Sequence, residues 1–349
     1  MTFGLVYRQD LPGLEIFFMI FLEKPLKFPH HFPITRQVLD YNFIVEVLMS
    51  TQAVTVPRLD VPNIERQLAR CPPLPSLGCI NKELQELLLA EQRYTAQIAE
   101  IIQRDPSLTS RLLRLVNSVY YGLSTPVNSI EEAVFYLGVR QIRQLAMATP
   151  IIEDFQRLTR QCAFPWRDFW QHCIGTAILA REITTAGQVV PDESDYVAGL
   201  VHDVGKIVMA WTFPDHFTEI HRRAAQTQQN LEEIETEILG LDHAELGALY
   251  LQRCRLPELI VATARFHHHP EKADHCAPTI AAVQIADLLL RSEKIGFSGN
   301  CAPVTLEQCF AASGYKILFT NSKKGEDVLV QASLSRTLKL IPSMLEGMV

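Results

Sequence analysis

The sequence of 349 residues lacks a long hydrophobic run, an excess of basic charge and a paired-cysteine motif. Residues 16–22 are strongly apolar, but this stretch is far shorter than the roughly 20 residues with which a helix crosses a bilayer. The segment before it carries Asp10 and Glu15, and no convincing small-residue cleavage site follows. We therefore expect neither a membrane span nor a secretory signal.

The charge balance argues against a general affinity for nucleic acid. Acidic residues outnumber basic ones and the formal net charge is −7, so no overall positive field attracts DNA or RNA, although a local basic face remains possible. The eight cysteines include no CxxC pair and read as reduced core residues, which is typical of a cytoplasmic protein. Glycine-rich phosphate loops, a nucleophile elbow and a dinucleotide fingerprint are also absent.

From about residue 62 the apolar residues recur at helical spacing. Asp105-Pro106 is a helix start signal, and Ser129 with Glu132 forms a capping box. Arg140 and Arg143 lie on the predicted helix that follows, so a DNA-binding helix-turn-helix is an alternative for this segment. The net negative charge of the chain argues against that alternative. No alternating pattern is long enough for a sheet, and the predicted class is all-α. Further helices are expected near 164–186, 192–211, 214–227, 230–239, 243–253, 256–267 and 276–292.

The first sixty residues differ in character from the rest. Met49, followed by Ser-Thr-Gln, looks like a natural start, and residues 1–48 then form an appended leader that we expect to be poorly ordered. A genuine docking segment is the alternative. We predict an N-terminal extension over residues 1–61.

The His202-Asp203 doublet interrupts an otherwise apolar stretch, residues 196–211, and Lys206 follows one helical turn later. Polar groups in a core helix cost about 1–3 kcal/mol each unless they are paired. A metal ion is one partner, and a carboxylate can bridge two ions. A buried hydrogen bond between His202 and Asp203, with Lys206 extending to solvent, is the other interpretation.

Other polar residues are ambiguous singly. His172 lies one turn after Asp168, and the two side chains can bind a metal or each other. His243 follows Asp242 at a predicted helix start, where Asp242 is the better cap. The histidines at 267–269 precede a proline, where they either complement a helix C-terminus or supply two metal ligands. Asp287 lies alone in an uncharged run and needs an arginine or a metal as counter-charge.

The order His172, His202-Asp203, Asp287 resembles the H…HD…D signature of the HD superfamily of metal-dependent phosphohydrolases. Several upstream blocks resemble more narrowly the HDOD family of bacterial signalling output domains, as does the Gly-rich segment 296–299. These blocks are Leu74-Pro75, residues 104–113, residues 116–122 and residues 133–138. The resemblance covers about residues 62–300.

The HDOD resemblance implies a two-lobed helical fold. The lobes are residues 62–160 and residues 161–300, and the second carries the metal site. Residues 301–349 are expected to form a C-terminal helical segment that packs on the domain.

Many HDOD proteins have lost their metal ligands, whereas this chain matches the ligand set of the related HD-GYP phosphodiesterases. The matching residues are His172, His202, Asp203, His243, His267, His268 and Asp287, with Lys206 also matching and Asp168 as an additional carboxylate. The Gly-Tyr-Pro loop of those enzymes is missing after His268, which argues against cyclic di-GMP hydrolysis. One or two divalent ions are expected, and iron, manganese and zinc all suit nitrogen and oxygen ligands.

Two functions follow from the resemblance. The first is a bacterial signal-transduction output module that binds a signalling protein and retains a structural or sensing metal site. The second is a metal-dependent phosphohydrolase acting on a nucleotide or another phosphoester. In the enzyme, Asp203 would bridge the metals and Lys206 would stabilise charge on the phosphoryl oxygens.

Overall fold

The structure is a computed structural model, and it describes the second half of the chain almost completely. Described are residues 43–51, 53–72, 113, 116–117, 126–129, 132–133, 136, 162, 164–189, 193–319 and 326–345. Every regular element in these ranges is a helix and none is a strand, which confirms the predicted all-α class. No helix in the described ranges is long and apolar enough to cross a membrane.

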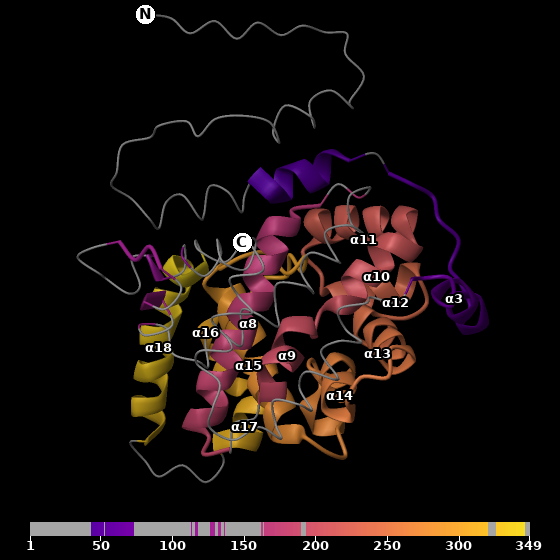
Figure 1. Cartoon of the computed structure of the whole chain (residues 1–349). Helices are drawn as coiled ribbons and strands as arrows, with labels where there is room; N and C mark the ends of the chain where they lie inside the picture. Colours follow the sequence, from indigo (N-terminus) through magenta and orange to yellow (C-terminus); the bar gives the residue numbers. More distant parts are fainter. Residues whose placement is uncertain are drawn as a thin grey trace, which may run out of the picture. The chain divides into compact units, whose positions relative to one another are not determined.

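Residues 43–50 are helical, and a series of labelled helices follows them, with short connections between residues 166 and 292 (Figure 1). They are α3 (Val61–Leu68), α8 (Trp166–Ala186), α9 (Glu193–Val201), α10 (Val204–Thr212), α11 (Pro214–Thr227), α12 (Leu231–Ile238), α13 (His243–Arg253), α14 (Glu258–Phe266), the 3-10 turn η2 (Pro270–Lys272), α15 (Ala277–Ser292), α16 (Leu306–Ala311), α17 (Ser313–Phe319) and α18 (Glu326–Leu345). The predicted helix starts and ends between residues 164 and 292 agree with these bounds to within two residues, except at one place.

That exception is the predicted single helix over residues 192–211, which is wrong. Two helices, α9 and α10, flank a break at His202 and Asp203. On a continuous helix adjacent side chains diverge by about 100°. The break frees both side chains from that constraint, and both are buried, at 0% and 1% exposure.

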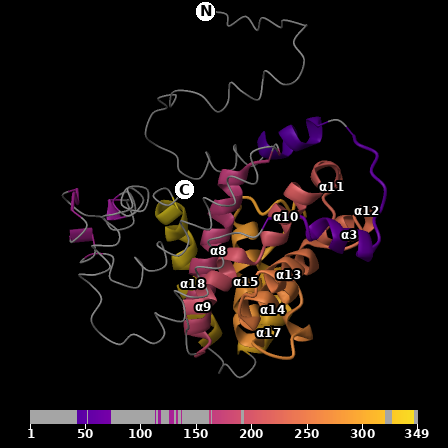
Figure 2. The same ribbon diagram turned by 45° about the vertical axis from the view of Figure 1, so that its right-hand side comes forward.

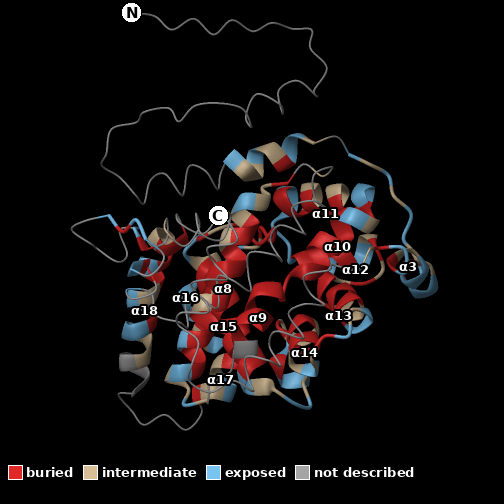
Figure 3. Cartoon of the chain, in the orientation of Figure 1, coloured by how far each residue is buried: buried red, intermediate tan, exposed pale blue. Residues whose placement is uncertain are grey.

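Helices α8 and α15 form the centre of the core. They lie side by side in two views, with α9 and α18 also against α8 (Figures 1 and 2). Buried residues surround most of both helices, whereas α18 is exposed along one side (Figure 3). A helix that is apolar around its whole circumference is typical of a core centre. Polar residues on α8 and α15 are therefore held away from water.

A second helical group, α10, α13 and α14, packs beside this centre. Gly205 on α10 lies directly against the backbone carbonyl of His243 at the start of α13, and a Cβ atom on Gly205 would overlap that carbonyl. Only glycine permits such an approach. The contact brings the α9–α10 break and the first residue of α13 together.

Two predicted capping interactions are present. Oδ1 of Asp242 accepts a hydrogen bond from the backbone N–H of Glu245 at 2.8 Å and caps α13. Oγ of Ser129 accepts one from the backbone N–H of Glu132 at 3.1 Å, as the capping box predicts. The start signal at Asp105-Pro106 and the predicted helix beyond residue 139 lie outside the described residues.

Residues 53–60 run extended beside α11 and α12. The backbone N–H of Val54 donates to Glu219 at 3.1 Å, and Nε2 of His216 donates to the carbonyl of Pro57 at 2.8 Å. The backbone N–H of Leu59 donates to the carbonyl of Leu239 at 3.0 Å. This part of the predicted N-terminal extension therefore contacts the domain. Residues 1–42 lie outside the described residues, and a start at Met49 stays a prediction.

The C-terminal helices contact the core helices. Helices α16 and α17 pack on α15, and α18 packs on α8. The predicted division into lobes at residues 160 and 300 stays a prediction.

Candidate metal centre

The seven predicted metal ligands converge from five places in the chain. His172 lies on α8, His202 and Asp203 at the α9–α10 break, His243 at the start of α13, His267 and His268 after α14, and Asp287 on α15. Their donor atoms form three overlapping groups, in each of which the atoms lie within 4.8 Å of one another. The groups are His172, His202 and Asp287; His202, Asp203 and His267; and His243, His267 and His268.

Asp203 lies between the histidine groups, and its two oxygen atoms face different groups. Oδ2 is 3.4 Å from Nε2 of His202 and 4.0 Å from Nε2 of His172. Oδ1 is 3.2 Å from Nε2 of His243 and 3.6 Å from Nε2 of His267. Asp203 therefore lies within reach of histidines from each of the three groups.

The hydrogen bonds of two histidines leave their Nε2 atoms available as ligands. Nδ1 of His202 donates to the carbonyl of Gly199 at 2.7 Å, and Nδ1 of His267 donates to the carbonyl of Ala264 at 2.8 Å. Because a carbonyl only accepts, the proton is on Nδ1 and the Nε2 lone pair is free. Both Nε2 atoms are buried without a hydrogen-bond partner. Nε2 lone pairs that have no hydrogen-bond partner and lie beside a carboxylate are suitable ligands for a cation.

Burial also keeps most of these histidines neutral, as metal ligation requires. It lowers the pKa of His267 to about 4, and it lowers the pKa values of His172 and His268 too. A neutral imidazole cannot repel a divalent ion. The environment thus favours the ligand form of these three side chains.

His243 differs because a buried carboxylate holds it. Oε2 of Glu235 accepts hydrogen bonds from Nδ1 of His243 at 2.6 Å and from its backbone N–H at 2.8 Å. Although burial opposes protonation, the charge of Glu235 raises the pKa of His243 to about 10. Glu235 was not recognisable from the sequence, because Glu232, Glu233 and Glu235 are equivalent residues on one short acidic helix.

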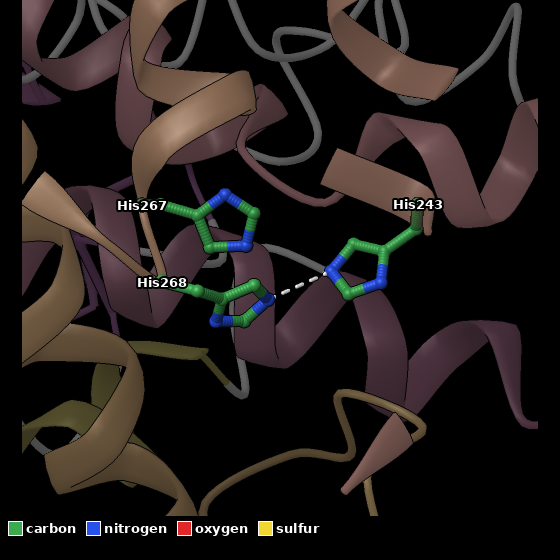
Figure 4. A group of neighbouring side chains, drawn as sticks. All are labelled: His243, His267 and His268. Atoms are coloured by element: carbon green, nitrogen blue, oxygen red, sulfur yellow. Dashed lines mark hydrogen bonds between the residues drawn. The ribbon is translucent and has the colours of Figure 1, made fainter. Parts of the chain in front are cut away.

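His268 completes the second group of histidines. Its Nε2 atom lies 3.0 Å from Nε2 of His243, and Figure 4 shows the two rings pointing toward one another from α13 and from the end of α14. The same atom lies 3.4 Å from Oε1 of Glu232. His269, in contrast, is 53% exposed and pairs with Glu271. Of the three consecutive histidines, two belong to the cluster.

Lys206 does not extend to solvent. Its Nζ atom donates to Oδ2 of Asp203 at 2.7 Å, and both side chains are at most 2% exposed. Burial opposes ionisation of Asp203, but Lys206 and His202 hold the pKa of this carboxyl well below its usual value. The interpretation in which Lys206 reaches water is wrong. Lys206 instead compensates the central carboxylate.

Asp287 has both a histidine and an arginine beside it. Oδ1 lies 3.0 Å from Nε2 of His172, outside hydrogen-bond geometry, and Oδ2 lies 3.4 Å from Nη1 of Arg291. Burial raises the pKa of Asp287, but Arg291 and His172 outweigh it and hold this pKa well below its usual range. The isolated carboxylate thus has the predicted arginine and also belongs to a group of metal-ligand type.

Asp168, the predicted additional carboxylate, lies outside the three groups. Its backbone carbonyl accepts from the N–H of Phe297 at 2.9 Å. Gly296, with φ of +68°, packs there against the backbone of Asp168 and His172, where a Cβ would overlap. The glycine loop singled out in the sequence therefore supports the turn of α8 that carries His172.

A cavity of about 270 Å³ reaches the cluster. His268, Asp287 and Arg291 line it together with Asn230, Glu232, His269, Gln284, Leu288, Pro303, Val304 and Gln308. Two of the clustered side chains are thus accessible to a small molecule.

The model of the family described as "HDOD domain" matches residues 74–270. The chain belongs to the HDOD family. A curated relative of this HDOD protein, an uncharacterized protein of Treponema pallidum, is 26% identical over 259 residues. That alignment covers 72% of this chain, and the chain spans about half the length of the relative.

Solved structures share the fold. An HDOD domain protein of unknown function from Geobacter sulfurreducens has a TM-score of 0.65 at 23% identity, covering 90% of this chain and 98% of its own. A protein from Shewanella amazonensis whose name suggests a phosphohydrolase has a TM-score of 0.60 at 22% identity, covering 82% and 98%. A protein from Marinobacter aquaeolei whose name suggests signal transduction has a TM-score of 0.58 at 21% identity, covering 90% and 67%. At these identities the likeness concerns the fold.

Proposed function

We propose that this HDOD protein is a signal-transduction output module with a divalent metal centre at its core. The observation that carries the metal centre is the position of Asp203, whose two oxygens face separate groups of buried histidines. We assign two ions, with His172, His202 and Asp287 around one and His243, His267 and His268 around the other. Family membership and the signal-transduction name of one structural relative support the signalling role.

The donor set restricts the metal. All seven side chains offer nitrogen or carboxylate oxygen, and none is a cysteine. Such a set suits manganese, iron or zinc rather than a thiolate-selected ion. The bound metal would take over the role of Lys206 in neutralising Asp203.

Hydrolysis of a phosphoester is the second candidate function, and the cavity that reaches His268 and Asp287 favours it. A divalent metal pair supplies Lewis-acid polarisation of a phosphoryl oxygen and a water of lowered pKa. The residues of the chain would orient that chemistry: Glu235 holds the His243 ring, Lys206 holds Asp203, and the surrounding helices exclude bulk water.

Metal analysis of purified protein tests the centre. After reconstitution with Mn²⁺ or Fe²⁺ we expect one to two ions per chain, and Asp203→Asn should lose most of them while its circular dichroism stays native. Asp215→Asn, an exposed aspartate outside the cluster, is the matched control. Less than about 0.2 ion per chain in the reconstituted wild type would contradict the proposal, because a formed site binds tightly.

An activity assay distinguishes the output module from the phosphohydrolase. The reconstituted protein is assayed on phosphodiesters and nucleotides. Metal binding without turnover supports the output module with a structural or sensing metal. Turnover that Asp203→Asn abolishes and Asp215→Asn leaves intact supports the phosphohydrolase.

A further inference from the structure

Arg291 is a half-buried cation whose hydrogen-bonding capacity is largely unused. Its side chain is 9% exposed, and it lies on α15 one turn after Asp287. Among the described residues, Nη1 lies 3.4 Å from Oδ2 of Asp287 and Nη2 lies 3.5 Å from the carbonyl of Ala302. Its Nε atom is buried without a partner. Both contacts exceed the usual 2.7–3.2 Å, and a guanidinium has five N–H donors.

A charged group with unsatisfied N–H donors inside a protein costs free energy unless another group accepts those hydrogen bonds. Arg291 lies on the wall of the cavity of about 270 Å³ that His268 and Asp287 also line. It also lines a second cavity of about 90 Å³, which His172 borders as well. The Arg291 side chain therefore borders two spaces beside the metal cluster, where a ligand could reach its guanidinium group.

The chemistry of the guanidinium restricts that ligand to an oxyanion. Its planar fork of N–H groups matches two oxygens of a phosphoryl or carboxylate group. A carboxylate has only two oxygens, so the fork would occupy both. A phosphoryl group has further oxygens and can contact Arg291 and a neighbouring cation at the same time.

The other walls of the larger cavity agree with a polar ligand. Gln308 and Asn230 carry amide groups, and Glu232 and Asp287 bring negative charge. The amide of Gln284 is held by the carbonyl of His268 and the backbone N–H of Gly314. The negative charge of the two carboxylates opposes an anion until a metal neutralises it. Binding should therefore be stronger in the metal-loaded protein than in the metal-free protein.

We propose that Arg291 binds the phosphoryl group of a phosphate-bearing ligand in the cavity beside the metal cluster. This inference rests on the proposed metal centre, since the metal offsets Glu232 and Asp287. It names a ligand class for either proposed function, because a phosphoester serves as a substrate for an enzyme and as a signal for an output module.

Calorimetric titration of the full-length, Mn²⁺-loaded protein tests the role of Arg291. The probes are AMP, inorganic phosphate and adenosine, which separate an organic phosphoester from free phosphate and from the nucleoside alone. Arg291→Gln should weaken AMP binding about tenfold or more, because a charge-assisted fork is lost. The matched control is Arg223→Gln, since Arg223 pairs with Glu237 at the surface and lines neither cavity. It should bind AMP as the wild type does.

The relative affinities of the three probes show whether the ligand is an organic phosphoester or free phosphate. AMP binding more tightly than inorganic phosphate, with adenosine not binding, supports an organic phosphoester as the ligand. Inorganic phosphate binding as tightly as AMP, still dependent on Arg291, supports the phosphoryl contact with free phosphate as its source. Adenosine binding as tightly as AMP overturns the proposal.

Metal content, measured in every variant, separates this inference from the metal centre itself. Equal metal content together with equal AMP affinity in wild type and Arg291→Gln overturns the role of Arg291 and leaves the metal centre standing. If the wild type takes up no metal, the metal centre fails. In that case AMP is titrated into the metal-free protein. If its binding does not depend on Arg291, this inference is overturned as well.

A conservative variant covers a failure of Arg291→Gln to fold. Arg291→Lys keeps the positive charge against Asp287 but loses the planar fork, and AMP binding should weaken about threefold or more. Unchanged AMP affinity in Arg291→Lys would overturn the proposal, whether or not Arg291→Gln folds. A second readout is the relaxation of the AMP phosphorus nucleus by bound Mn²⁺, which Arg291→Gln should reduce and Arg223→Gln should not.

Discussion

The ammonium group of Lys206 lies 2.7 Å from Oδ2 of Asp203, and both side chains are buried. Asp203 also faces histidines on both sides, so Lys206 compensates the carboxylate that lies between four of the clustered histidines. A residue that the sequence suggested for phosphate contact therefore has a partner inside the protein. Its first role is to allow Asp203 to stay ionised in the core.

Replacing Lys206 tests this role. In chelator-treated protein, Lys206→Met should lower the free energy of unfolding by about 3–5 kcal/mol, because it leaves a buried charge without its partner. Urea unfolding followed by circular dichroism measures the loss. Adding Mn²⁺ should restore more stability to Lys206→Met than it adds to the wild type, since the ion replaces the missing charge. The exposed Lys272→Met is the control, and equal stability of Lys206→Met and wild type would contradict the assigned role.

Glu235 should control metal affinity without being a ligand. Glu235→Gln keeps the size of the side chain but removes the charge that orients His243, and metal affinity should fall about 10- to 100-fold. Competition for Mn²⁺ against a fluorescent chelator measures this change. Glu237→Gln, on the same helix and 61% exposed, should leave the affinity unchanged. An affinity equal to that of wild type in Glu235→Gln would show that His243 needs no such support.

The stability of the protein should depend on pH through His221. Burial lowers the pKa of His221 to about 3, and its hydrogen bond to the carbonyl of Phe217 offsets this only in part. Below pH 6.5 the unfolded chain binds a proton at His221 that the folded chain does not, so stability is present above pH 6.5 and is lost as the pH falls toward 3.

His221→Met removes this contribution. Between pH 6 and 4 the wild type should lose about 1.4 kcal/mol per pH unit more than the variant, corresponding to one proton. Urea unfolding at several pH values provides the two slopes. Because the other histidines titrate in both proteins, the difference between the slopes isolates His221. Parallel slopes would show that His221 is protonated in the folded state.

The helical fold was predictable because its signals are local. The starts and ends of α11, α13 and α15 follow from residue spacing and from caps such as Asp242, which act within one turn. The break between α9 and α10 was not predictable in this way. Its cause is the packing of His202 and Asp203 against distant helices, which overrides the helical tendency of their apolar neighbours.

The cluster was predictable only as a set of residues. Residue types and their order singled out all seven side chains, including the two histidines at 267 and 268. Asp168 was singled out with them, but helix spacing alone does not tell which face of α8 turns toward α15. Glu235 and Arg291 were not singled out. Their importance depends on the places where α12 and α15 bring them, next to His243 and to the cavity.

The sequence by itself determined the helical class, the family and the identities of the residues with metal-ligand chemistry, because periodicity, capping and motif order are properties of the chain. The tertiary structure decided the roles within that set. It placed Asp203 between two groups of histidines, turned Lys206 inward, and placed Arg291 on the wall of a cavity. These roles depend on distances between helices far apart in the chain, which only the packing of the core establishes.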